Sequence, residues 1–309
     1  MPVAERLLSF GEPPRQAPKI SVLTPFHRHD PSALIGRLAH AGADVELVLL
    51  DDGSATAALI ARVSAAAAAI GTPSRIVVWD QNQGRAAARN RLIEAARGEY
   101  VLFLDADMLP DSEHYLDTWL RLIQAERPYV AFGGLSLRYA QATPATALHH
   151  GLFARSDCKP ARQRERAPAQ TVATANLLVR RDFLAAYPFD DGFVGWGFED
   201  VDWALRAAKH APITHIDNPA THVGLDEVDV LLRKCAEAGP NFGRLARKHP
   251  AAVSRFAAHR AALALKFAPA RTWMRHAFAW LAREASAPMS VRCAALKLYR
   301  ASHYAEYLP

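Results

Sequence analysis

The chain has few cysteines and no long apolar run. Its three cysteines, Cys158, Cys235 and Cys293, are far apart in 309 residues and make no paired spacing. This argues against a disulfide framework or a cysteine-based zinc site, and it favours a reducing compartment. No window offers the roughly 18 apolar residues that span a bilayer, and residues 1–19 lack the apolar core of a signal peptide. We therefore expect a cytoplasmic protein.

Two common glycine-based phosphate-binding motifs are missing as well. A dinucleotide-binding fold would place G-x-G-x-x-G after its first strand, but residues 24–28 read Thr-Pro-Phe-His-Arg. The P-loop pattern does not occur either. A phosphate bound by this chain must therefore be neutralised by a cation, either a metal ion or arginine.

Charge is unevenly spread along the chain. The net charge is +6, but the residues from Asp226 onward hold 14 of the 37 Lys and Arg and only 6 of the 31 Asp and Glu, giving +8 there and −2 before it. A basic region of this kind would suit nucleic acid or an anionic membrane surface. No motif that combines aromatic and basic residues on a sheet supports the first interpretation, so we expect no nucleic-acid partner.

Short apolar runs alternate with helical patterns over the first half of the chain. Four strands, each followed by a helical segment, are predicted at residues 19–24, 45–50, 75–79 and 101–104. This alternation implies an α/β fold with a mostly parallel, Rossmann-like sheet and helices on both faces. We expect a tail, a sheet domain and a basic helical extension, at residues 1–18, 19–224 and 225–309.

Polar residues follow each predicted strand. The strand at 101–104 ends in Asp105 and Asp107, and the strand at 45–50 leads into Asp51 and Asp52. Ligands of open α/β sheets bind outside the carboxyl ends of the strands. Two carboxylates one residue apart suit Mg²⁺ held together with substrate phosphates. A solvated acidic turn would explain one such pair, but not four polar strand ends at one edge.

A second acidic pair follows a tight aromatic turn. Gly195 and Gly197 flank Trp196, and the next helix begins with Glu199 and Asp200. Acids favour helix N-termini through the helix dipole, which explains the acids but not the turn before them. The same dipole is expected to keep Asp200 ionised and therefore a weak base.

Two further segments each allow two interpretations. Residues 155–170 carry five basic residues, two acids and two prolines, which predicts a mobile loop that is either solvated or closes over an anionic ligand. One aromatic helix face is defined by Trp273, Ala277, Trp280, Leu281 and Glu284. We expect this face to pack on the sheet domain, with a membrane surface as the alternative.

Together these segments resemble the family 2 glycosyltransferases with the GT-A fold. The resemblance covers about residues 19–224 and is carried by residues 20–30, 51–54, 82–90, 105–107 and 195–200. The last of these segments, Gly-Trp-Gly-Phe-Glu-Asp, is also similar to galactosyltransferase-type and chondroitin-polymerase-type enzymes. Residues 225–309 match no family that we can name.

The resemblance implies a nucleotide site and a metal site. Asp52, with Asp51 beside it, and Asp105 would contact the base or ribose of a uridine nucleotide. Asp107 would hold Mn²⁺ or Mg²⁺ on the diphosphate, and His222 would complete the metal site, as a histidine does in the galactosyltransferase-like relatives. Thr24, Pro25 and Phe26 would form the wall around the uracil, Arg85 would reach the uracil, and Arg28 would also belong to the nucleotide site.

The resemblance also implies an acceptor side. Asp200 would be the catalytic base and Glu199 a ligand of the acceptor hydroxyl. Trp196 and Gly197 would belong to the sugar and acceptor pocket. A base must take the acceptor's proton as it attacks from the face opposite the diphosphate, which inverts the anomeric centre.

The sequence therefore predicts an inverting, metal-dependent hexosyl- or N-acetylhexosaminyltransferase. It would use a UDP-sugar and a hydroxyl acceptor, a carbohydrate or other glycan, in polysaccharide or glycoconjugate synthesis, with a peripheral membrane contact through the C-terminal helices. The alternatives are a retaining transferase, a transferase for another nucleotide and a non-catalytic nucleotide-sugar-binding protein. A nucleotidyltransferase would need a glycine-rich basic first loop, which the sequence lacks.

Overall fold

The computed structural model describes residues 3–12, 16–39, 42 and 44–309. Its main sheet has the strand order β1-β4-β3-β2-β5-β9-β7-β10. Four strands pair in parallel, as the alternation predicts: β2 (Ile20–Phe26), β3 (Val45–Asp51), β4 (Ser74–Trp79) and β5 (Tyr100–Phe103). β9 (Leu177–Arg180) runs antiparallel between β5 and β7 (Val130–Phe132), and β10 (Ile213–His215) is parallel to β7. The predicted α/β class is confirmed.

The segment expected to be a tail contributes an edge strand instead. Residues Glu5–Phe10 form β1, which pairs antiparallel with β4. Its Glu5 carboxylate accepts hydrogen bonds from Trp79 Nε1 at 3.0 Å and from Arg91 Nη2 at 2.5 Å. The tail interpretation is wrong for Glu5–Phe10, because an edge strand that is covered on one side needs no continuous apolar run. Residues 1–2 and 13–15 lie outside the described residues.

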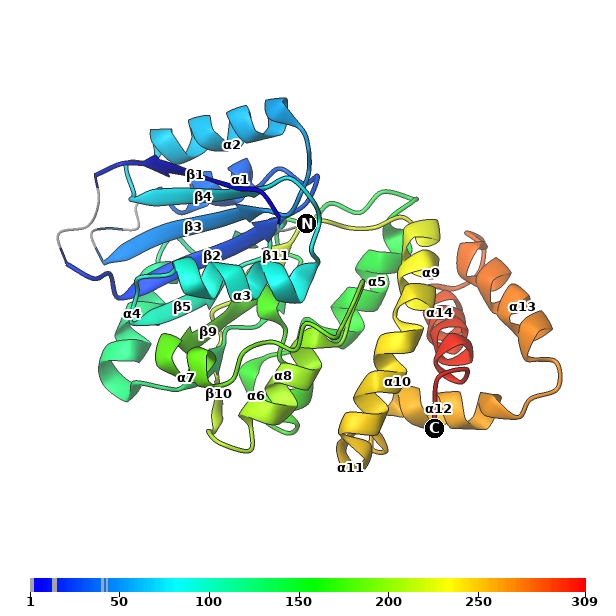
Figure 1. Ribbon diagram of the computed structural model, residues 1–309. Helices are drawn as coiled ribbons and strands as arrows, with labels where there is room; N and C mark the ends of the chain where they lie inside the picture. The colour runs from blue at the N-terminus through cyan, green and yellow to red at the C-terminus, as the bar shows by residue number, and fades with distance from the viewer. Residues whose placement is uncertain (1–2, 13–15, 40–41, 43) are drawn as a thin grey trace.

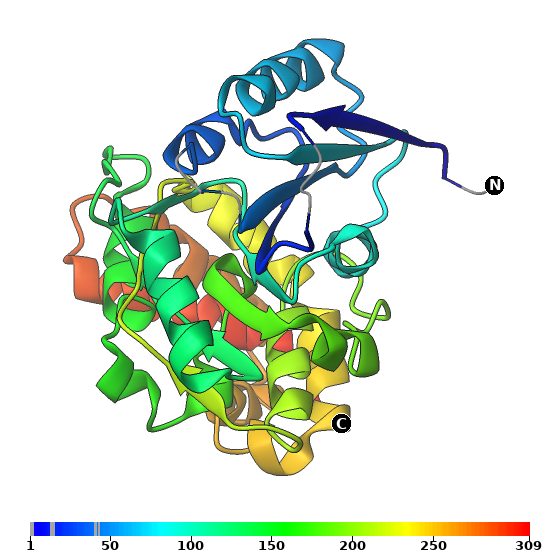
Figure 2. The ribbon, with the colours of Figure 1, turned by 90° about the vertical axis from the view of Figure 1, so that its left-hand side faces the viewer.

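Helices cover both faces of the main sheet (Figures 1 and 2). α3 (Arg85–Ala95) and α7 (Arg181–Ala186) lie on one face. α1 (Ser32–Arg37), α2 (Ala57–Ala69) and α4 (Tyr115–Glu126) lie on the other. Every residue of β3 is buried, as expected for a parallel strand with helices on both sides.

A small second sheet places one histidine beside the acidic strand end. It has the order β6-β11-β8, formed by β6 (Met108–Pro110), β11 (Ala220–His222) and β8 (Leu135–Ser136). β11 is antiparallel to β6, with His222 opposite Met108. The register therefore brings His222, from far along the chain, next to Asp107.

The predicted helical extension is confirmed, while its boundary as a domain stays a prediction. Its helices are α9 (Val228–Glu237), α10 (Gly239–Lys248), α11 (Pro250–Val253), α12 (Ala257–Lys266), α13 (Arg271–Arg283) and α14 (Met289–Tyr304). α14 packs against the others at the side of the molecule away from β1 (Figure 1). Among the described residues, no helix has the length and apolarity that crossing a bilayer requires.

Residues 155–170 are structured, contrary to the loop prediction. They include the end of α5 (Ala147–Ser156), α6 (Ala161–Arg164) and a 3-10 helix at Pro168–Gln170. Arg164 is buried, and its guanidinium donates to the carbonyls of Phe132 at 3.1 Å and Ile216 at 2.7 Å. This arginine satisfies carbonyls at the ends of β7 and β10, so its charge anchors the segment instead of meeting a ligand.

Candidate active site

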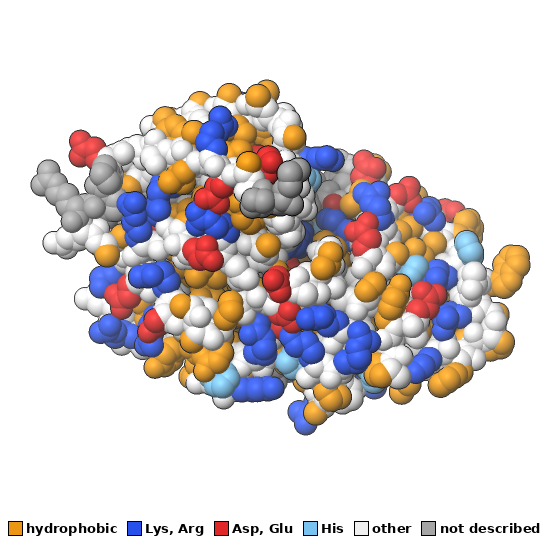
Figure 3. Space-filling view, viewed as in Figure 1, with side chains coloured by type: hydrophobic (Ala, Val, Ile, Leu, Met, Phe, Trp, Pro, Cys, Tyr) orange, Lys and Arg blue, Asp and Glu red, His pale blue; other side chains and the backbone are white. Residues whose placement is uncertain are grey.

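A cleft of about 1210 Å³ opens between the carboxyl ends of the strands and the C-terminal helices. Figure 3 shows the surface hollowed between these two halves of the molecule. One wall comes from the ends of β2 and β5 and the start of α3, and the other from α5, α9 and α14. Eight predicted site residues line it: Pro25, Phe26, Asp52, Arg85, Asp105, Asp107, Trp196 and His222. Six others do not: Thr24, Arg28, Asp51, Gly197, Glu199 and Asp200.

The predicted metal ligands face each other at the sheet edge. His222 Nε2 lies 3.2 Å from Asp107 Oδ2. Burial alone would raise the pKa of Asp107, but the hydrogen bond and charge of His222 outweigh it, and the pKa is lowered. Burial alone would lower the pKa of His222, but the hydrogen bond and charge of Asp107 outweigh it, and the pKa is raised. A Cβ on Gly224 would lie 2.1 Å from Asp107 Oδ2, so a larger residue there would displace the Asp107 side chain.

This pair fits a divalent cation whose remaining ligands come from the substrate. The described residues contain no group of three His, Cys, Asp or Glu that could hold a metal. The pair offers one carboxylate oxygen and one imidazole nitrogen, and His222 Nδ1 is buried without a hydrogen-bond partner. A site of this kind is completed by phosphate oxygens and water.

The Asp51–Asp52 pair is built into the sheet edge. Asp51 is buried and accepts a hydrogen bond from Ser54 N at 3.1 Å. Asp52 accepts from Gln83 N at 2.6 Å and Gly84 N at 3.0 Å, and burial raises its pKa. Asp52 thus ties the end of β3 to the loop before α3, and it also lines the cleft.

The loop after β2 turns its arginine away from the cleft. Arg28 is exposed, has a positive φ of 55°, and donates its backbone N–H to Ser54 Oγ at 2.7 Å. Its neighbours His27 and His29 line the cleft instead. Thr24 is buried within β2, and its hydroxyl has no hydrogen-bond partner. Of the predicted uracil wall, only Pro25 and Phe26 reach the cleft.

A buried ion-pair network joins the two acidic sites, and the sequence analysis missed its centre. Arg89 is buried in α3, with Nη1 2.8 Å from Glu199 Oε1 and Nη2 3.3 Å from Asp105 Oδ1. Burial would raise the pKa of Glu199, but the charge of Arg89 lowers it. Glu199 is therefore occupied by Arg89 rather than presented on the cleft wall. Arg89 lies within residues 82–90, which carry the resemblance, but no local pattern in the sequence marks its side chain as buried.

Asp200 is the second residue of α8 (Glu199–Ala207), and its pKa differs from the expectation. Its side chain is tightly packed but keeps some solvent exposure. Burial, and then the charge of Glu199, raise the pKa of Asp200 to about 7. The expectation that the helix dipole keeps it a weak base is wrong, because desolvation and a like charge outweigh the dipole.

The fold is the GT-A fold, which the chain shares with solved structures of low sequence identity. TarS from S. aureus (residues 1–349) has a TM-score of 0.54 and 15% identity, covering 93% of this chain and 89% of that one. The mannosyltransferase PcManGT from Pyrobaculum calidifontis, solved in complex with GDP-Man and Mn²⁺, has a TM-score of 0.53 and 16% identity, covering 77% and 67%. These likenesses concern the fold alone.

The sequence comparison gives the family. The model of glycosyl transferase family 2 matches residues 21–187, more than half of the chain, and the chain belongs to this family of enzymes. The match ends before residues 195–200, so the likeness of that segment to galactosyltransferase-type enzymes stays a prediction.

Two curated relatives are proteins of polysaccharide synthesis. The amylovoran biosynthesis glycosyltransferase AmsB of Erwinia amylovora is 26% identical over 178 residues, covering 53% of this chain and 54% of that protein. The succinoglycan biosynthesis protein ExoO of Rhizobium meliloti (strain 1021) is 42% identical over 76 residues, covering 24% and 20%. The matches thus span about half and a fifth of the lengths of these relatives.

Proposed function

We propose that the protein is an inverting, metal-dependent transferase that moves a hexosyl or N-acetylhexosaminyl group from a UDP-sugar to a hydroxyl of a glycan acceptor. The observation that carries the proposal is the Asp107–His222 pair at 3.2 Å on the wall of a cleft that Asp52 and Arg85 also line. The names of AmsB and ExoO support a role in polysaccharide synthesis. The fold relative solved with Mn²⁺ supports the use of a divalent ion.

We assign a role in binding the nucleotide-sugar donor to each of seven residues that line the cleft. Asp107 and His222 would hold Mn²⁺ or Mg²⁺, which when bound offsets the charge of the leaving diphosphate. Arg85, half exposed at the start of α3, can approach the same phosphates. Pro25 and Phe26 would cover the uracil, while Asp52 and Asp105 lie within reach of the base and ribose.

The acceptor side rests on Asp200 and Trp196. A carboxylate with a pKa of about 7 is a competent proton acceptor near neutral pH. Trp196 lines the cleft and offers an apolar face to a sugar ring. Asp200 stands four residues after it, at the start of α8, which suits a base that takes the proton of an acceptor hydroxyl lying against Trp196.

UDP should bind more tightly than GDP or ADP when Mn²⁺ is present, because Pro25, Phe26 and Asp52 shape the base site. Isothermal titration calorimetry with the three diphosphates tests this. Equal affinities would contradict the uracil assignment, and tighter GDP binding would move it to guanine.

The anomeric configuration of the product, determined by NMR, separates the inverting from the retaining mechanism. Absence of turnover would leave a nucleotide-sugar-binding protein.

We also propose a peripheral membrane contact through α12 and α13. Trp273, Ala277 and Trp280 of the face that we expected to pack on the sheet domain are exposed. Helix α13 packs through the opposite face, which includes Ala279 and Ala282. Trp273 is 81% exposed, Phe267 82% and Trp280 61%. Exposed tryptophan and phenylalanine beside basic residues are typical of surfaces that lie in the bilayer interface.

Charge supports an anionic membrane as the occupant of this surface. Residues 238–283 contain nine Lys and Arg and no Asp or Glu. An acid-free basic stretch that exposes two tryptophans matches a lipid surface with negative headgroups. The enzyme would thereby work beside a membrane-bound glycan.

Vesicle binding tests this contact. Vesicles of phosphatidylcholine with phosphatidylserine should bind the protein, and binding should weaken with salt, since screening acts within about 10 Å at 0.1 M. The double variant Trp273→Ala/Trp280→Ala should lose binding. Leu7→Ala, which removes an exposed apolar side chain from β1 far from α13 (Figure 1), should not. Equal binding to neutral and anionic vesicles would contradict the proposal.

A further inference from the structure

The turn that carries Trp196 has an unfavourable backbone. Gly195 and Gly197 have φ of 80° and 92°, and Phe198 has φ of 76°. Glycine adopts this region freely, but a bulky side chain such as phenylalanine rarely does. A conformation of this kind persists only where surrounding groups hold it in place.

One side chain from the C-terminal helices binds this turn. Asn241, in α10, is 4% exposed. Its Nδ2 lies 3.0 Å from the carbonyl oxygens of both Val194 and Gly197 and 3.3 Å from that of Trp196. An amide carries two N–H donors, so this single group satisfies the carbonyls that the turn points inward.

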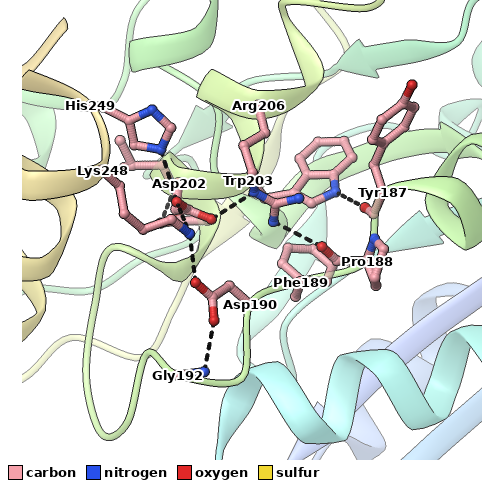
Figure 4. Close-up of polar contacts among 12 residues, drawn as sticks. Tyr187, Pro188, Phe189, Asp190, Gly192, Asp202, Trp203, Arg206, Lys248 and His249 are labelled. Atoms are coloured by element: carbon pink, nitrogen blue, oxygen red, sulfur yellow. Dashed lines mark hydrogen bonds and ion pairs between the residues drawn. The ribbon is translucent and has the colours of Figure 1, made fainter. Parts of the chain in front are cut away.

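Neighbouring residues of α10 hold the chain on both sides of the turn. Before it, Asp190 pairs with Arg244 at 3.0 Å and with Lys248 at 2.5 Å. After it, Asp202, in α8, pairs with Lys248 at 2.7 Å and with His249 at 2.9 Å. Figure 4 shows Lys248 in contact with both carboxylates and His249 in contact with that of Asp202.

The strained phenylalanine is fixed by the same helices. The ring of Phe198 lies 5.4 Å from that of Phe242 in α10 and 5.6 Å from that of Tyr304 in α14. These two rings stack on each other at 4.2 Å, and both are fully buried. The C-terminal helices therefore hold the turn by its backbone, by its side chain and by the segments on either side.

We infer that Asn241 is a positioning residue for the transfer reaction: it fixes the 194–198 turn so that Trp196 faces the cleft and Asp200 starts α8 in place. The inference rests on the proposed function of Trp196 and Asp200. It makes α10 a support of the active site, although α10 lies outside the region that the family model matches. A merely structural Asn241 would join α10 to the turn without affecting the chemistry.

Asn241→Asp separates these roles, because it keeps the shape of the side chain and removes both N–H donors. Hydrogen exchange measured by mass spectrometry should show amides of residues 193–200 exchanging at least about tenfold faster. With a UDP-sugar and Mn²⁺, kcat should fall by about 10- to 100-fold, since small misplacements of catalytic groups have effects of that size. The affinity for UDP with Mn²⁺ should stay within about twofold, because Asn241 does not reach the donor side.

Two companion variants keep the test decisive. Ser302→Ala removes a buried hydroxyl of α14 that bonds only Arg275 and Tyr299; it should lower the melting temperature without changing exchange at 193–200 or kcat. Asn241→Ser, which retains one donor, should fall between wild type and Asn241→Asp. Normal exchange and turnover in Asn241→Asp would overturn the inference, as would equal losses in Ser302→Ala. If wild type fails to bind UDP, the proposed donor fails, whereas the exchange result still decides whether Asn241 holds the turn.

Discussion

Asp107→Ala should lower turnover of a UDP-sugar by about three orders of magnitude, the scale of several kcal/mol of charge stabilisation by a metal. Asp107 is one of two described side chains that we assign to the ion, and His222 alone offers a single nitrogen. The loss should appear in calorimetry too, with Mn²⁺ no longer strengthening UDP binding. Excess chelator should reproduce both effects in wild type.

Asp117→Ala is a matched control for this variant. Asp117 is an exposed acid in the first turn of α4, and its carboxylate lies 3.3 Å from His114 Nδ1. Its removal changes the net charge of the protein by the same amount and should leave turnover unchanged. Full activity of Asp107→Ala, or of wild type in excess chelator, would show that the reaction does not depend on this site.

The parts of the site that were predictable are those encoded in short segments. Asp105 and Asp107 follow a buried strand, and a strand end in an α/β sheet identifies the ligand-binding edge by itself. The position of His222 followed from the resemblance, and the register of β11 with β6 places it beside Asp107. The parallel core followed from short apolar runs rich in strand formers that alternate with helical patterns.

The parts that were missed depend on contacts between distant residues. Arg89 and Glu199 are 110 positions apart, and no local pattern distinguishes a buried arginine in a helix from an exposed one. The three hydrogen bonds of Asn241 depend on how α10 packs. The exposed face of α13 was misjudged because a helical period gives the direction of the apolar face but not what covers it.

The pKa of about 7 for Asp200 leads to a stability effect with a defined sign. An aspartate ionises near pH 3.8 in the unfolded chain, whereas burial and Glu199 raise the pKa of Asp200 to about 7 in the folded protein. The folded state is therefore disfavoured as pH rises through this window, and the full cost is present above pH 7. Asp200→Asn should melt at a higher temperature than wild type at pH 8, and the difference should vanish near pH 4.

Asp200→Asn should also be nearly inactive. Losing a general base lowers kcat by about 10²- to 10⁴-fold, while UDP with Mn²⁺ should bind as in wild type because we assign Asp200 to the acceptor and not to the nucleotide. In wild type, kcat should fall tenfold per pH unit below about pH 7, as the base becomes protonated. Steady-state kinetics over roughly pH 5 to 9, a range that brackets this pKa, measure the fall in kcat at low pH.

Glu199→Gln provides the contrast to Asp200→Asn. It removes the closer of the two carboxylates that pair with buried Arg89, at 2.8 Å, and leaves Asp105 at 3.3 Å as the remaining partner. Removing one partner from a buried ion-pair network is destabilising. This variant should therefore lower the melting temperature at pH 8, where Asp200→Asn raises it, and any weakening of acceptor binding should come with that loss. A normal kcat in Asp200→Asn, or loss of UDP binding with the fold intact, would mean that another group takes the acceptor's proton and that Asp200 has a different role.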